Sequence, residues 1–189
     1  MPFRLLGLTA HPDQAGQLCG QTFARYTAAG SLTTLVCAAG HGCDTASARA
    51  IGQRLGLTDM VLIDDRPGEL DSAGLESLFV DVMTSVRPHV VVVDRAQPVI
   101  WDAARLAFDR ARRRAGGTAA LPAKLYFRPA AGMDAIPVTT AVSIPEAGAE
   151  LFVRAFPNPW VTGVLERDLF AGVTMNPLSA ADLPHRLAS

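Results

Sequence analysis

The chain is poor in the features that mark several classes of protein. Only three of its 189 residues are cysteines, and Cys19, Cys37 and Cys43 show no C-x-x-C spacing. This sparse, odd set argues against a disulfide framework and favours a reducing compartment. No apolar run approaches the roughly 20 residues that a membrane span needs, and the first apolar run is too short for a signal peptide. We therefore expect a cytoplasmic protein that has no membrane partner.

Charge of either sign is also scarce. Charged residues make up 19% of the sequence, and the formal net charge is −1. Because there is no excess of basic residues, we do not expect a nucleic acid as partner. The one dense basic group, Arg110 with Arg112, Arg113 and Arg114, lies at the end of a helical pattern before Gly116. Positive charge there complements the helix dipole, and the alternative interpretation of the group is an anion site.

The sequence is rich in short apolar runs that alternate with helical patterns, and hydrophobic residues make up 49% of it. Such alternation predicts βαβ units and a parallel sheet. Four successive valines at 90–93 are typical of a central strand that is buried on both faces. The pattern predicts strands at 3–8, 32–38, 60–63 and 89–93, and helices at 14–29, 45–55, 74–86 and 101–114.

The pattern changes after Gly116 and Gly117. Short strands are predicted at 125–128 and 135–144, and short helices at 149–155 and 161–169. Two prolines in the last residues predict a poorly ordered tail over 176–189. The whole pattern predicts an α/β protein: a single three-layer α/β/α Rossmann-like domain over 1–175, with a mostly parallel sheet and a small irregular C-terminal part.

The most informative motif is Ala10-His11-Pro12-Asp13-Gln14, which follows the first predicted strand. In open α/β sheets, ligands bind outside the carboxyl ends of the strands. An imidazole and a carboxylate placed there suit metal binding or proton transfer. The alternative interpretation is a turn and a helix cap that take part in no reaction.

The order of motifs resembles the PIG-L/LmbE family, whose members are zinc-dependent deacetylases of N-acetylglucosamine conjugates and related N-acyl substrates, with a Rossmann-like fold. The family's Ala-His-Pro-Asp-Asp signature corresponds to residues 10–14, and its Leu-Gly-Val helix end corresponds to 55–57. Its Arg-Pro-Asp-Val-Val-Val strand corresponds to 87–92. The resemblance covers residues 3–115 and implies an LmbE-like fold.

The resemblance also implies roles for single residues. His11 corresponds to a zinc ligand, and Asp13 to the general base that acts on the zinc-bound water. Gln14 stands where the family has an aspartate that ligates zinc. A further ligand comes from a His-Pro-Asp-His motif that begins the helix after the valine-rich strand. When this motif is aligned on its aspartate, Asp102 keeps the position and Ala103 replaces the ligand histidine.

Zinc is therefore the cofactor expected for the family, but this chain lacks part of the ligand set. A catalytic zinc usually has three protein ligands, and one imidazole with a neutral amide does not supply them. Without the metal, Asp13 alone cannot generate hydroxide from water. The resemblance thus predicts a deacetylase-like protein with a degenerate zinc site, which binds zinc weakly or not at all and has impaired or no activity.

Two alternatives remain open. The first is an active amidohydrolase with a rearranged metal site that uses His11, Asp13 and His41, since His41 follows the second predicted strand. The second is a non-catalytic protein that binds a small sugar-like or N-acyl ligand or takes part in an assembly, including a homo-oligomer. The residues predicted to line the crevice are Gln14, His41, Trp101 and Asp102. His89, which begins the valine-rich strand, is predicted to be a capping or buried neutral histidine.

Overall fold

In the computed structural model, side chains are described within 2–38, 43–63, 71–94, 97–116, 122 and 124–127, and the backbone also at 136–138 and 150–154. Seven strands in these ranges form a sheet in the order β3-β2-β1-β4-β5-β7-β6. The strands are β1 (Arg4–Thr9), β2 (Leu32–Cys37), β3 (Asp59–Leu62), β4 (Val90–Val93), β5 (Lys124–Phe127), β6 (Ile136–Val138) and β7 (Glu150–Arg154). The helices are η1 (Pro12–Gln14), α1 (Ala15–Ala28), α2 (Thr45–Arg54), α3 (Ser72–Val86) and α4 (Pro98–Ala115).

The direction of strand order reverses at β1. The chain runs outward from β1 through β2 to β3, and it then returns to the other side of β1 to form β4 and β5. All four of these strand pairs are parallel, whereas β7 is antiparallel to both β5 and β6. The predicted mostly parallel sheet is therefore confirmed. In sheets of this kind, the crevice outside the carboxyl ends of the two strands at the reversal, here β1 and β4, is where ligands bind.

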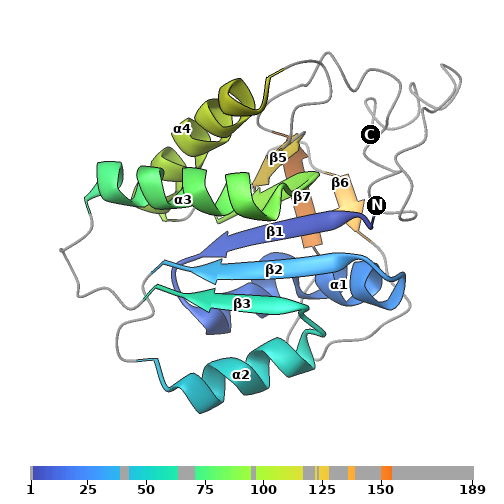
Figure 1. The fold of residues 1–189 in the computed structure, drawn as a ribbon. Helices are drawn as coiled ribbons and strands as arrows, with labels where there is room; N and C mark the ends of the chain where they lie inside the picture. The colour runs from blue at the N-terminus through green and yellow to red at the C-terminus, as the bar shows by residue number, and fades with distance from the viewer. Residues whose placement is uncertain are drawn as a thin grey trace, which may run out of the picture.

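Helices cover both faces of the sheet, with α3 and α4 on one face and α1 and α2 on the other (Figure 1). Side chains alternate in direction along each strand, so β1 contributes Leu5 to the core beneath α1 and contributes Leu6 and Leu8 to the core beneath α3 and α4. The valines of β4 divide between the two cores in the same way. This arrangement confirms the predicted three layers and explains why the strand is apolar at every position.

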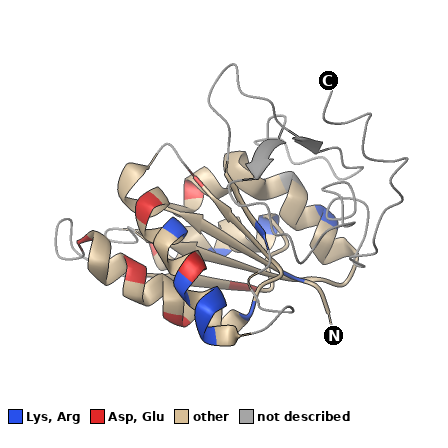
Figure 2. Ribbon diagram, turned by 90° about the horizontal axis from the view of Figure 1, so that it is seen from above, with Lys and Arg blue, Asp and Glu red and all other residues tan. Residues whose placement is uncertain are grey.

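The basic group at the end of α4 has carboxylate partners. Arg110 Nε lies 2.7 Å from Glu76 Oε1 on α3, and Arg113 Nη1 lies 2.6 Å from Asp109 Oδ2. Figure 2 shows basic and acidic segments interspersed along the helices rather than gathered in a patch of one sign. The group therefore belongs to the packing of α3 and α4. None of the helices in the described part is both long and apolar enough to cross a membrane.

Two helix predictions are wrong in ways that matter. The segment predicted as a helix over 149–155 contains strand β7, which pairs antiparallel with β5. The helix predicted from Trp101 begins instead at Pro98, because proline at the first helical position lacks only an N–H that would have no partner inside the helix. Trp101 and Asp102 are thus one turn inside α4. The predicted helix at 161–169 and the predicted tail at 176–189 lie outside the described residues.

Candidate functional site

The motif after β1 folds into a tight turn that its own side chains close. The backbone N–H of His11 donates to Gln14 Oε1 at 3.2 Å, and the N–H of Gln14 donates to the His11 carbonyl at 3.2 Å. Thr9 Oγ1 donates to the same carbonyl at 3.0 Å. Pro12, buried at the first position of η1, suits this helical start. The side-chain oxygen of Gln14 is therefore engaged inside the turn.

The two chemically active side chains of the motif lie on the surface of this turn. His11 and Asp13 are exposed, whereas Gln14 is half-buried. The 3-10 helix that carries Asp13 contacts α1 and α2, so the motif leans toward that layer of the molecule. An exposed imidazole and an exposed carboxylate at the carboxyl end of the central strand are available to a ligand in the crevice.

The end of β2 places a thiol beside the motif. Cys37 Sγ lies 3.6 Å from Thr9 Oγ1, and Cys37 is opposite Thr9 in the register of the two strands. Burial raises the pKa of the Cys37 thiol to about 11, with the hydrogen bond from Thr9 opposing the shift and the nearby Cys43 and Asp13 adding to it. Cys37 is thus a neutral thiol at physiological pH in the absence of a metal, which does not favour a role as nucleophile. His41, predicted to face the same crevice, lies outside the described residues.

The end of β4 adds a carboxylate that sequence reasoning missed. Asp94 directly follows the four valines, and its N–H donates to the Leu8 carbonyl at 3.3 Å. Because Leu8 pairs with Val93, Asp94 lies next to Thr9 across the point where the strand order reverses. Its side chain is half-buried. The available signal was its position as the first polar residue after a fully buried strand.

The two predicted crevice residues of α4 lie in the opposite layer. Trp101 is half-buried and packs edge-on against Phe127 at the end of β5, with 5.0 Å between the ring centroids. Asp102 is exposed, and Ala103 is fully buried in the core between α3, α4 and the sheet. A side chain at Ala103, the position that the resemblance aligns with a ligand histidine, therefore points into the core.

The described site residues thus lie at the carboxyl end of the parallel strands, where the arrowheads of β1, β2 and β3 lie in Figure 1, but in two different layers of the molecule. His11, Asp13 and Gln14 come from the turn beside α1 and α2, and Trp101 and Asp102 come from α4. Among the described residues, no three His, Cys, Asp or Glu side chains are placed to hold a metal together. The described donor set does not fit a catalytic zinc, which usually takes three such ligands.

Comparison with known proteins identifies solved structures with a similar fold. No family model matches the chain, and no curated protein matches its sequence. The conserved protein TT1542 from Thermus thermophilus is similar in structure, at 24% identity and a TM-score of 0.54 over 71% of this chain and 70% of that one. GalB, the 4-carboxy-2-hydroxymuconate hydratase from Pseudomonas putida, is similar at 19% identity and a TM-score of 0.47 over 67% and 65%.

N,N'-diacetylchitobiose deacetylase from Pyrococcus horikoshii is similar at 17% identity and a TM-score of 0.45 over 57% of this chain and 49% of that one. A fold can host unrelated reactions, so likeness at these identities shows the architecture alone. By fold the chain groups with the conserved Thermus protein, and deacetylases of the PIG-L/LmbE type are among the solved structures that it resembles.

Proposed function

We propose that the chain is a PIG-L/LmbE-type, deacetylase-like protein whose zinc site has degenerated, so that hydrolysis of N-acetyl groups is impaired or lost. The observation that carries this proposal is the engagement of Gln14, whose Oε1 accepts the His11 N–H at 3.2 Å within the turn. A carboxylate at this position would add a charged oxygen toward a metal, whereas a neutral amide turned back to the backbone adds none. His11 then lacks its nearest co-ligand.

The start of α4 supports a second loss. The His-Pro-Asp-His motif implied by the resemblance begins this helix, and the helix begins at Pro98. Alignment of the motif on its aspartate places Ala103 at the ligand histidine, and alignment on its proline places Ile100 there. Both residues belong to the core beneath α3 and α4. Neither an alanine nor an isoleucine offers an electron pair to a metal, so two of three ligand positions hold side chains that do not coordinate zinc.

Without a zinc ion, the residues of the crevice can still bind a ligand. His11 and Asp13 can donate and accept hydrogen bonds to the hydroxyl and amide groups of a small sugar-like or N-acyl ligand, and the side chain of Trp101 offers an apolar surface at the same edge of the sheet. Asp13 without a metal does not activate water, because the pKa of free water is far above neutral. We therefore infer that the protein binds a small molecule. We also propose that it is cytoplasmic and either monomeric or a homo-oligomer.

A second candidate is an active amidohydrolase with a rearranged metal site. Asp94 favours it, because this half-buried carboxylate lies beside Thr9 at the reversal point and would replace the carboxylate missing at Gln14. His11 and His41 would be the other ligands, and Asp13 would act as the base. Stoichiometric zinc that is lost from both the His11→Ala and the Asp94→Ala proteins would establish this candidate in place of the first.

The proposal is tested by restoring a ligand. The Gln14→Asp variant should bind zinc more tightly than the parent protein by about tenfold or more, measured by competition with a chromogenic chelator. The matched control is Gln14→Asp, His11→Ala, which keeps the new carboxylate and removes the imidazole. Equal zinc binding by these two variants, or zinc-dependent acetate release from N-acetylglucosamine by the parent protein, would contradict the proposal.

A further inference from the structure

Strand β3 leaves one edge of the sheet open, because within the described residues it pairs only with β2. The N–H of Ile63 donates to the Cys37 carbonyl on the β2 side at 2.9 Å. Backbone groups alternate in direction along a strand, so the N–H groups of Met60 and Leu62 point away from β2. Open backbone groups of this kind are a template for an added strand.

One of these outward N–H groups already has a hydrogen-bond acceptor from a side chain. The N–H of Met60 donates to Asp59 Oδ1 at 2.9 Å, so the carboxylate of the preceding residue takes the place that the carbonyl of an added strand would take. The carboxylate of Asp59 is easily displaced from this N–H, because Asp59 is exposed and its carboxylate can then bind water. Within the described residues, this edge is thus capped by a side chain rather than covered by another strand.

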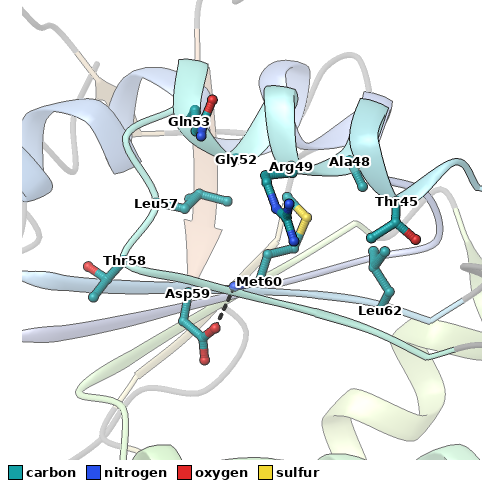
Figure 3. A pocket seen from close by; sticks show the side chains of 10 residues that line it. All are labelled: Thr45, Ala48, Arg49, Gly52, Gln53, Leu57, Thr58, Asp59, Met60 and Leu62. Carbon is teal, nitrogen blue, oxygen red and sulfur yellow. Dashed lines mark hydrogen bonds between the residues drawn. The ribbon is translucent and has the colours of Figure 1, made fainter.

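A groove of about 350 Å³ lies along this edge, between α2 and β3 (Figure 3). Leu57, Met60 and Leu62 form its apolar part. Figure 3 shows Arg49 extending from α2 over the groove toward Met60, while Asp59 points to the opposite side of the strand. Within the described part of the chain, Arg49 has no ion pair or hydrogen bond, and its side chain is exposed. Asp59 also belongs to the lining, so the groove offers the guanidinium of Arg49 beside one carboxylate at the strand, open backbone groups and apolar side chains.

We propose that this groove and the open edge of β3 bind an extended, acidic peptide segment of a partner protein by strand addition. The peptide backbone pairs with Met60 and Leu62 and displaces the carboxylate of Asp59. Alternate side chains of the peptide enter the groove, where an acidic one meets the guanidinium of Arg49. Main-chain hydrogen bonds supply affinity in such complexes, and the groove supplies the selection for charge.

A second copy of this chain fits the groove less well. Its own β3 would present Met60 and Leu62 on the groove side, because these residues pack toward its α2. It would offer Arg49 no carboxylate, since Asp59 points to the other face of the strand. Charge complementarity thus favours a different, acidic strand.

The test uses the full chain and two fluorescein-labelled peptides, acetyl-Thr-Val-Glu-Val-Thr-amide and its lysine-centred counterpart, with binding followed by fluorescence anisotropy. The acidic peptide should bind more tightly, and Arg49→Glu should weaken it by about tenfold while improving the lysine peptide. Arg54→Glu, an equal charge change on α2 outside the groove, should leave the preference unchanged. In ¹⁵N–¹H spectra, the amide signals of Met60 and Leu62 should shift on binding.

Two further probes separate strand addition from simple charge attraction. The acidic peptide with N-methyl groups on its pairing residues should lose binding, and Asp59→Ala should strengthen binding of the unmodified peptide several-fold. The proposal is overturned if neither peptide binds at millimolar concentration, or if Arg49→Glu does not reverse the preference. It is also overturned if light scattering shows a dimer that Arg49→Glu leaves intact and that the acidic peptide does not dissociate.

Discussion

Gly7 lies where the middle of β1 meets a phenylalanine of α1. A Cβ atom added to Gly7 would come within 2.7 Å of Phe23 Cζ and 3.1 Å of Leu35 Cδ1. Both neighbours are fully buried, so they have little room to move. The absence of a side chain at this position lets α1 approach the central strand, and that approach fixes where the turn with His11 and Asp13 follows.

Substitution Gly7→Ala should therefore lower the free energy of unfolding by about 1–3 kcal/mol, because overpacking forces the core apart. Gly16→Ala is the matched control, since nothing lies within 4 Å of a Cβ there and the residue is helical. The control should be neutral or stabilising by up to about 1 kcal/mol. Urea denaturation of both proteins measures the difference, and equal midpoints would contradict the close approach at Gly7.

His89 was predicted to be a capping or buried neutral histidine, and the structure agrees. Its Nδ1 accepts the N–H of Arg4 at 3.1 Å, and its ring stacks on Phe3 with 5.0 Å between centroids. Burial, with a smaller contribution from the positive charge of Arg4, lowers the pKa of His89 to about 4. The imidazole is therefore neutral in the folded protein at physiological pH.

This shift predicts a pH dependence of stability. Between pH about 6.5 and about 4 the unfolded chain takes up a proton at His89 and the folded chain does not, so the free energy of unfolding falls as the pH falls through this window. Below about pH 4 the folded chain also binds the proton at His89, so this fall in the free energy of unfolding is complete. His89→Asn keeps an acceptor without a titrating ring, and it should flatten the dependence in thermal denaturation series. An unchanged slope in that variant would contradict the assignment to His89.

Among the elements, α3 and α4 are held together partly by charge. The side chain of Glu76 is 8% exposed, and its partner Arg110 crosses from the next helix at 2.7 Å. The pair between Arg113 and Asp109 joins two side chains that are 69% and 54% exposed. Two pairs on one helix thus differ in burial, and burial decides how much the loss of a partner costs.

Arg110→Ala should destabilise the protein by about 1–3 kcal/mol, because it leaves the buried carboxylate of Glu76 without its counter-charge. Arg113→Ala should change stability by less than about 0.5 kcal/mol, since exposed pairs contribute little. Urea denaturation of both variants is the measurement. Similar losses in the two would show that burial of Glu76 does not control the effect.

The elements also show what the sequence predicts well and where it fails. The four valines of β4 can be assigned from the sequence because a strand buried on both faces is apolar at every position. Strand β7 was predicted as a helix because its short segment is stabilised by pairing with β5, which a local pattern does not contain. The start of α4 was missed because Pro98 was not used as the first helical residue.

For the whole molecule, the site was predictable only in outline. The edge of the sheet that carries His11 and Asp13 follows from strand order, which βαβ alternation indicates. The hydrogen bond that engages Gln14 depends on the conformation of one turn, and the position of Asp94 depends on the register between β1 and β4. Neither contact is encoded in residue spacing, so neither could be predicted from the sequence.

The most direct test of the proposed degenerate zinc site is the zinc content of the whole protein after incubation with excess zinc and exhaustive dialysis, measured by inductively coupled plasma mass spectrometry. With Gln14 engaged in its turn and apolar residues on α4, we expect much less than one zinc per chain, unchanged by His11→Ala. One zinc per chain that disappears in the His11→Ala protein would contradict it.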